Sequence, residues 1–186
     1  MATEDILSHL KVGFDEYKGL TDKFYYKTSL QKIAVTPRWW SSYGSELESV
    51  VFDWKDIKYT DLDGHLSGDS NNGDGIGVYL FVVKPDFSII NLPGYVFYVG
   101  IAGERDSERH LRDRLRQYIQ VSSISKRNKV QTALELYHHE TYVFYSKLNV
   151  SSVELSEIES NLHGYFMPWA NERDYPAPVK RARGAW

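Results

Sequence analysis

The stretch GVYLFVVKPDFSIINLPGYVFYVG, residues 77–100, decides the fold of this chain. Its two ends, 77–83 and 95–100, are rich in β-branched and aromatic residues, a composition typical of β-strands. Between them, a Pro-Asp pair and a Pro-Gly pair mark turns. The stretch therefore predicts a β-hairpin with a long loop.

The two predicted strands carry glycine and tyrosine in mirrored order. Gly77-Val78-Tyr79 opens the first strand, and Tyr98-Val99-Gly100 closes the second. In adjacent strands, Tyr79 and Tyr98 would stand side by side on one sheet face. The two glycines would leave open surface beside them, where a backbone or a phosphate can approach. Taken alone, each tyrosine is equally well explained as a core aromatic residue with a satisfied hydroxyl group.

Patterns on either side of this hairpin predict the other elements. Apolar spacing predicts helices over 106–120 and 128–138, and TYVFYSKL, 141–148, predicts a third strand. A capping-box pattern at 151–154 opens a further helix, which Pro168 ends. The order of these elements predicts an α/β (α+β) fold with a small antiparallel sheet.

The N-terminal part of the chain has a different character. Residues 4–18 predict a short helix, and residues 20–60 are aromatic and irregular. The segment DLDGHLSGDSNNGDG, 61–75, is dense in turn-forming residues and predicts a loop or linker. We therefore divide the chain into an N-terminal extension of unknown role, 1–74, a main domain, 75–172, and a basic C-terminal tail, 173–186.

Composition limits the classes of protein to be considered. The 186 residues include no cysteine, which excludes disulfides and thiolate metal sites and fits a reducing compartment. Neither a secretory signal nor an apolar run of about 18 residues is present, so we expect a cytoplasmic protein with no membrane partner.

Positive charge is concentrated locally, although the net charge is −3. Segment 104–129 carries 8 Lys or Arg residues against 4 Asp or Glu residues. A basic strip of this kind can hold phosphate, although a solvated helix face is the simpler explanation of charge alone. The candidate nucleic-acid-binding residues are Arg112, Arg116, Lys126, Arg127, Lys180 and Arg181.

A glutamate is predicted on the apolar side of the last helix. Leu155, Ile158 and Leu162 form a stripe there, and Glu159 points about 40° from Leu155 at about 100° per residue. A carboxylate that faces a core is costly unless it is paired, hydrogen-bonded or bound to a metal. The sequence leaves open whether Glu159 binds a metal or pairs with a structural arginine.

Arg114 and Tyr118 present the complementary feature. They are four residues apart on a predicted helix and so share one face. Alone, Arg114 is well explained by an aliphatic stem that reaches out to solvent. If these two residues, Tyr79, Tyr98 and Glu159 converge, the patch holds one carboxylate, one guanidinium and several phenols. That inventory suits metal-assisted hydrolysis of a phosphodiester.

These residues resemble the GIY-YIG nuclease family. Gly77-Val78-Tyr79 and Tyr98-Val99-Gly100 match its two signature triplets. The run RLRQY, 114–118, resembles its helix motif Arg-apolar-x-x-Tyr/His. The run ESNLHGYFMPWAN, 159–171, resembles its Glu-x-x-Leu…Pro-x-x-Asn element. The four elements occur in order, and the resemblance covers about residues 75–172.

The resemblance implies a small three-stranded antiparallel sheet flanked by helices, and endonuclease activity on DNA with a divalent metal. By match to the family, Glu159 would be the ligand of Mg²⁺ or Mn²⁺, and Arg114 would bind the phosphate that is cleaved. One of Tyr79 and Tyr98 would act as general base or orient the attacking water; we favour Tyr79. An unperturbed phenol, with a pKa near 10, is a poor base at neutral pH.

Two further residues acquire roles from the resemblance. Tyr118 would hydrogen-bond near the nucleophile or the phosphate. Asn171 would hold a phosphate oxygen or brace the site. The catalytic residues expected from the sequence are therefore Tyr79, Tyr98, Arg114, Tyr118, Glu159 and Asn171.

We thus expect a metal-dependent DNA endonuclease that acts in restriction or anti-phage defence, in repair or in the propagation of a mobile element; of these settings we favour restriction or defence. The alternative is a noncatalytic subunit that binds nucleic acid or protein and retains the nuclease fold. RNA is not excluded as a substrate. A homodimer, or a partner protein bound through residues 1–74, is also possible.

Overall fold

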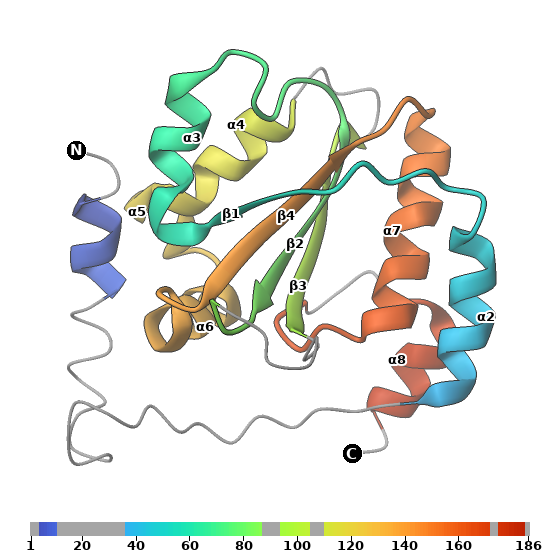
Figure 1. The fold of residues 1–186 in the computed structure, drawn as a ribbon. Coiled ribbons are helices and arrows are strands. Elements are labelled where there is room, and N and C mark those ends of the chain that lie inside the picture. Colours follow the sequence, from blue (N-terminus) through green and yellow to red (C-terminus); the bar gives the residue numbers. More distant parts are fainter. Residues whose placement is uncertain (1–3, 11–35, 87–93, 105–109, 172–174, 185–186) are drawn as a thin grey trace.

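The structure is a computed structural model that describes residues 4–10, 36–86, 94–104, 110–171 and 175–184. These residues form a mixed α/β fold with one four-stranded antiparallel sheet, in the order β1-β4-β2-β3 (Figure 1). The strands are β1, Lys55–Lys58; β2, Gly77–Val83; β3, Tyr95–Ala102; and β4, Thr141–Lys147.

The three strands expected from the sequence are confirmed. β2 and β3 pair antiparallel, with Gly77 opposite Ala102 and Tyr79 opposite Gly100. The register shifts between Phe81 and Val82, as at a β-bulge. On its other side β2 pairs with β4, so β2 is a central strand and is almost completely buried.

Helices cover both faces of the sheet (Figure 1). On one face lie α3, Leu62–Gly68; α4, Leu111–Arg116; a 3₁₀ turn, Gln117–Ile119; α5, Val121–Ile124; and α6, Asn128–Tyr137. Residues 4–10 are also helical and bury Ile6 and Leu10 in the core of this face. On the other face, α7, Ser152–Phe166, packs against β3 and against α2, Pro37–Leu47. A last helix, α8, spans Ala177–Arg183.

The alternation of β2 and β3 divides the core into two layers. Tyr79, Phe81 and Phe97 point to the layer shared with α4 and α6, called the tyrosine layer below. Val78 and Val99 point to the layer shared with α7, called the aliphatic layer below. Side chains alternate between the two faces along β2 and along β3, except at the bulge, where Phe97 and Tyr98 lie on the same face. One hairpin therefore supplies the aromatic contacts of the first layer and the aliphatic contacts of the second.

The expectation of a three-stranded sheet is wrong, because β1 adds a fourth strand beside β4. The strand has the sequence KDIK, in which Ile57 is the single apolar residue, and its first two residues are exposed. Its composition therefore gives no strand signal. Backbone pairing along the edge of β4 determines its conformation, and that pairing is a tertiary contact.

The expected loop over 61–75 is also wrong in part, because α3 occupies its first half. Leu62 and Leu66 are one helical turn apart and fully buried. Their burial stabilises a helix in which Gly and Asp residues are otherwise unfavourable. Similarly, α2 lies within the segment that the sequence left irregular.

The described part of the predicted N-terminal extension, 1–74, packs into the same body as 75–172. β1 belongs to the common sheet, and Tyr59 and Leu62 lie in one core cluster with Tyr79. Within the residues that the structure describes, this part of the extension therefore shares the hydrophobic core of the main domain.

The turn-rich segment after α3 fixes the start of α4. The backbone N–H groups of Leu111 and Arg112 donate to the carbonyls of Gly75 and Gly73, at 2.9 and 2.6 Å. Both glycines have positive φ, 70° for Gly73 and 89° for Gly75, which favours glycine. At Gly73 a Cβ atom would lie 2.9 Å from the backbone nitrogen of Arg112. The loop thus satisfies the first donors of the helix that carries Arg114.

The predicted capping box at the start of α7 is confirmed. The Ser151 side chain accepts a hydrogen bond from the Glu154 N–H, and the Glu154 carboxylate accepts from the Ser151 N–H. At the other end, Met167 has left-handed angles, φ 49° and ψ 49°, and Pro168 follows, so the predicted end is also confirmed.

Ser151→Ala is expected to destabilise the protein by about 0.5–2 kcal/mol, because α7 loses its N-terminal cap. Urea unfolding measures the free energy of unfolding. Ser156→Ala on the same helix is the matched control: its exposed hydroxyl donates to the Ser152 carbonyl, and we expect a change within about 0.5 kcal/mol. Equal losses in the two variants would contradict a specific role for the cap.

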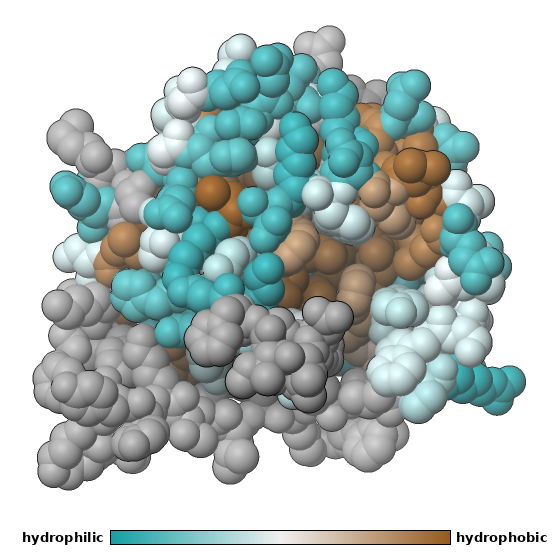
Figure 2. All heavy atoms as spheres, viewed as in Figure 1, coloured by the Kyte–Doolittle hydropathy of each residue, from teal (hydrophilic) through white to brown (hydrophobic). Residues whose placement is uncertain are grey.

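An apolar hollow of about 350 Å³ lies on the α7 side of the sheet. Figure 2 shows brown, apolar side chains gathered between β4 and the α7–α2 pair. Its lining includes Phe52, Trp54, Leu80, Val82, Phe144, Leu162 and Phe166. These residues face the aliphatic layer, on the opposite side of the sheet from Tyr79 and Tyr98.

Candidate active site

Tyr79 and Tyr98 lie side by side on one face of the sheet, as the sequence predicted. Tyr98 is opposite Phe81 in the β2–β3 pairing, so it shares a face with Tyr79, two residues earlier in β2. The ring centres of Tyr79 and Tyr98 are 6.2 Å apart.

The close backbone approach expected beside the glycines is confirmed at Gly77, but the space expected for a phosphate is wrong at both glycines. A Cβ atom at Gly100 would lie 2.4 Å from the Tyr79 hydroxyl oxygen, so the Tyr79 ring fills the space that this glycine leaves. A Cβ atom at Gly77 would lie 2.1 Å from the Ser146 carbonyl oxygen, so the β4 backbone fills that space. Neither glycine leaves room for a phosphate; Gly100 admits a phenol, and Gly77 admits a neighbouring strand.

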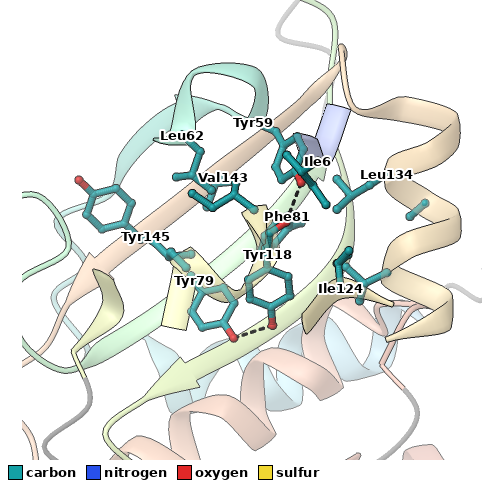
Figure 3. Packing of buried hydrophobic residues seen from close by; sticks show 14 of the residues in the cluster. Ile6, Tyr59, Leu62, Tyr79, Phe81, Tyr118, Ile124, Leu134, Val143 and Tyr145 are labelled. Atoms are coloured by element: carbon teal, nitrogen blue, oxygen red, sulfur yellow. Dashed lines mark hydrogen bonds between the residues drawn. The ribbon is translucent and has the colours of Figure 1, made fainter. Parts of the chain in front are cut away.

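Tyr118 completes a cluster of three phenols. Its hydroxyl lies 2.8 Å from the Tyr79 hydroxyl, and the two rings lie side by side with their hydroxyl groups pointing the same way (Figure 3). The ring centres of Tyr98 and Tyr118 are 5.7 Å apart. The helix motif and the two strand motifs therefore meet, as the resemblance implied.

Burial distinguishes the three phenols. Tyr79 and Tyr118 are each 0% exposed, whereas Tyr98 is half-buried. Burial raises the pKa of Tyr79 well above its ordinary value, and the nearby Tyr98 phenol raises it further. Burial likewise raises the pKa of Tyr118. Both buried phenols are therefore protonated at neutral pH, which is unfavourable for a general base.

Arg114 reaches this cluster from α4. Its side chain is 24% exposed, and Nη2 donates to Glu104 Oε1 at 3.1 Å. Burial lowers the pKa of Arg114, but the contributions of Tyr79, Tyr118 and Glu104 together raise it above its ordinary value. Its Nε atom is buried without a partner among the described residues. The site thus holds a permanently charged guanidinium beside Tyr79.

Arg127 brings a second guanidinium to the same phenols. Its Nη1 donates to the hydroxyl oxygens of Tyr118, at 3.0 Å, and Tyr98, at 3.3 Å. Its Nη2 donates to Gln117 Oε1 at 3.0 Å, and the guanidinium carbon lies 4.7 Å from the centre of the Tyr118 ring. The sequence placed Arg127 among surface DNA contacts and gave no sign of these bonds.

Glu159 lies on α7, which packs against β3 from the face opposite the phenols. Its neighbours one turn away, Leu155 and Leu162, are buried, whereas Glu159 is half-buried and has an interaction partner. The carboxylate therefore occupies the rim of the apolar stripe, not its interior as the helical spacing predicted. Among the described residues, the contacts that the structure gives to Arg114 and to the three phenols do not include Glu159.

Asn171 braces β3. Its Oδ1 accepts from the Val99 N–H at 2.9 Å, and its Nδ2 donates to the Val99 carbonyl at 2.8 Å and lies 2.9 Å from His163 Nε2. The Ala170 N–H donates to the Phe97 carbonyl at 2.9 Å. These bonds cover the free side of an edge strand. Of the two roles expected for Asn171, the geometry favours bracing, because Asn171 is 7% exposed and its amide is occupied.

Residues of the C-terminal tail contact the segment 168–171, which contains Asn171 and covers the free side of β3. The Tyr175 hydroxyl donates to the carbonyls of Pro168 and Asn171, and the Arg183 guanidinium lies 4.1 Å from the Tyr175 ring centre. Part of the predicted basic tail, 173–186, is therefore folded as α8 onto the segment that covers β3.

The other predicted DNA contacts divide into two kinds. Arg112 donates to the backbone carbonyls of Asp69 and Asn72 and so holds the loop before β2. Its guanidinium therefore has a structural function. Lys126, Lys180 and Arg181 are exposed, and Arg116 is half-buried.

Two residues near the site carried no sequence signal. The buried Tyr59 hydroxyl donates to the Tyr118 carbonyl at 2.7 Å and so fixes the 3₁₀ turn that carries this phenol. Glu104 follows β3 and pairs with Arg114. Neither contact could be found from spacing, because Tyr59 and Tyr118 are 59 residues apart, and Glu104 and Arg114 lie on different elements.

Fold and site together define an α/β protein with an arginine–tyrosine cluster. No family model, curated protein or solved structure matches this chain. Among the described residues, no helix is both long enough and apolar enough to cross a membrane.

Proposed function

We propose that this protein is a metal-dependent endonuclease that hydrolyses phosphodiester bonds of DNA. One observation carries the proposal: the guanidinium groups of Arg114 and Arg127 meet Tyr79, Tyr98 and Tyr118 beside β3. Two positive charges among neutral phenols are suited to an anion, and guanidinium groups match the geometry of phosphate oxygens. The resemblance of the same residues to the GIY-YIG family supports the proposal.

Arg114 would bind the phosphate that is cleaved. Its side chain is partly exposed, and one of its nitrogens pairs with the half-exposed Glu104, which can exchange this contact for a phosphate oxygen. A guanidinium that is held in place stabilises the charge that develops on the phosphate oxygens during hydrolysis.

Tyr98 is the phenol best placed to orient or deprotonate the attacking water. It reaches the surface, whereas Tyr79 is completely buried and its pKa is raised by burial. This replaces our sequence-based preference for Tyr79 as the base. Tyr79 and Tyr118 would instead support the site from the buried side, through their mutual hydrogen bond.

Glu159 would hold the Mg²⁺ or Mn²⁺ ion. A half-buried carboxylate on α7 suits a hard cation, which prefers oxygen ligands and retains several waters. The proposed site uses one carboxylate, with water molecules as the other ligands of the ion. The bound ion would stabilise negative charge on the phosphate and on the leaving oxygen.

Cleavage of supercoiled plasmid tests the proposal. The wild-type protein is expected to nick DNA with Mg²⁺ or Mn²⁺ and to lose this activity with a chelator. Glu159→Gln is expected to lower the rate at least about 100-fold, because it removes the charge that holds the metal. A labelled RNA in the same assay decides between DNA and RNA as substrate.

Glu157→Gln is the matched control, because Glu157 lies on the exposed side of α7. It is expected to retain the wild-type rate. Equal nicking by wild type and Glu159→Gln would mean a contaminating nuclease or a wrong site. No cleavage of DNA or RNA under any of these conditions would favour the noncatalytic alternative.

A further inference from the structure

Two hydrogen bonds fix the backbone of Arg127, and buried residues of the tyrosine layer lie on either side of it in the sequence. Its N–H donates to the Ile124 carbonyl at 2.8 Å, and its own carbonyl accepts from the Gln131 N–H at 2.9 Å. Ile124 is 0% exposed and Val130 is 3% exposed. The side chain is therefore directed at the phenols from a rigid position at the start of α6.

The positively charged side chain of Arg127 forms its hydrogen bonds with neutral groups. Its three side-chain hydrogen bonds reach two phenols and the Gln117 amide oxygen. Within the described part of the chain, no carboxylate lies within ion-pair distance of it. Arg114, in contrast, pairs with Glu104. The positive charge of Arg127 is thus available to the phenol cluster and to any anion bound there.

The donors and acceptors in this cluster determine where the hydroxyl hydrogen of Tyr98 points. A guanidinium only donates, so the oxygens of Tyr98 and Tyr118 both accept from Arg127. The Tyr118 hydroxyl is also bonded to Tyr79. For the Tyr98 hydroxyl hydrogen, the described residues provide no acceptor. The Tyr98 oxygen therefore accepts a hydrogen bond from Arg127, and the O–H bond of Tyr98 is directed away from the cluster.

We propose that Arg127 is a positioning residue: it occupies one lone pair of the Tyr98 oxygen and fixes this phenol so that its O–H group and its remaining lone pair face the substrate. The contact itself is a property of the folded protein; its effect on catalysis rests on the proposed nuclease function. This role differs from the surface DNA contact that the sequence suggested for Arg127. It also differs from that of Arg114, which would touch the phosphate itself.

The contact is tested by NMR on protein with ¹³C at the ζ carbon of tyrosine. Tyr98→Phe and Tyr118→Phe identify the two signals. Arg127→Gln is expected to shift both signals by more than their linewidth, since each oxygen loses a charged donor. The Tyr142 signal, whose hydroxyl donates to Asp86, is expected to stay in place. Lys126→Gln, which removes a neighbouring exposed charge, is expected to move neither signal.

Single-turnover cleavage tests the consequence. Arg127→Gln is expected to lower the rate at saturating DNA about 10- to 100-fold, because Tyr98 is no longer held in position. Its KM is expected to change less than about threefold. Lys126→Gln is expected to change only KM. Arg127→Lys, which keeps the charge, is expected to be intermediate, and added guanidinium ion is expected to restore part of the rate of Arg127→Ala.

The outcomes separate this inference from the proposed function. An unchanged Tyr98 signal in Arg127→Gln would overturn the contact. A raised KM with an unchanged saturating rate would make Arg127 a DNA contact and overturn the positioning role. If the wild-type protein cleaves no nucleic acid, the proposed function fails, and the NMR experiment still decides whether Arg127 holds Tyr98. Near-ultraviolet circular dichroism verifies that each variant is folded.

Discussion

Arg114→Gln is expected to lower the single-turnover rate of DNA cleavage by about 10³- to 10⁵-fold, the range for an arginine that stabilises a phosphoryl transition state. The guanidinium stands beside Tyr79 with 24% of its side chain exposed, and Glu104 is its acidic partner among the described residues. Glutamine removes the charge and the forked donors but retains much of the length and polarity. The fall is expected in the rate at saturating DNA.

Arg116→Gln is the matched control, because it removes one positive charge from the same helix, two residues away. We expect it to weaken DNA binding at most a few-fold. Arg114→Lys keeps the charge but loses the planar fork, so its rate is expected to lie between those of wild type and Arg114→Gln. If Arg116→Gln were as defective as Arg114→Gln, the loss would reflect net charge on α4, and the assignment of Arg114 would be wrong.

Tyr98→Phe is expected to lower the cleavage rate by about 10²- to 10⁴-fold, as for removal of a general acid–base group. Tyr79→Phe is expected to cost about tenfold, because it perturbs the packing below the site without removing a group that meets water. The difference follows from burial: Tyr79 is 0% exposed and its pKa is raised, whereas Tyr98 is half-buried.

Both variants keep the aromatic ring, so their thermal unfolding is a direct control. Tyr79→Phe leaves the buried Tyr118 hydroxyl without its phenol partner and is expected to lose about 1–3 kcal/mol of stability. Tyr98→Phe is expected to lose less, because its hydroxyl is partly solvated. A greater loss of cleavage in Tyr79→Phe than in Tyr98→Phe would return the role of general base to Tyr79.

Local signals in the sequence were sufficient for much of the fold. The β-branched and aromatic runs predicted β2, β3 and β4, and the capping box and Pro168 predicted both ends of α7. These features lie within short windows, where side-chain alternation, caps and proline geometry act directly on the backbone. For the same reason, the spacing of Tyr79 and Tyr98 was enough to place them on one face.

Elements with weak local signals were missed. The polar strand β1 and the Gly- and Asp-rich helix α3 owe their conformation to contacts with β4 and the tyrosine layer. No window of the sequence contains those contacts. The helix expected over 4–18 is described for 4–10, and residues 11–18 lie outside the described residues. The helix expected over 106–120 is observed over 111–116 with the following 3₁₀ turn to Ile119, whereas His110 and Gln120 are extended and residues 106–109 lie outside the described residues.

The sequence by itself determined the hairpin, the capped helix and the residue types of the candidate site, because these depend on the identity and spacing of near neighbours. Tertiary structure alone decided which phenol is buried, which arginine holds Tyr98, and that Asn171 covers β3. These are matters of solvent access and hydrogen-bond partners from distant elements. Desolvation, which separates Tyr79 from Tyr98, is a property of the folded layers and not of either tyrosine.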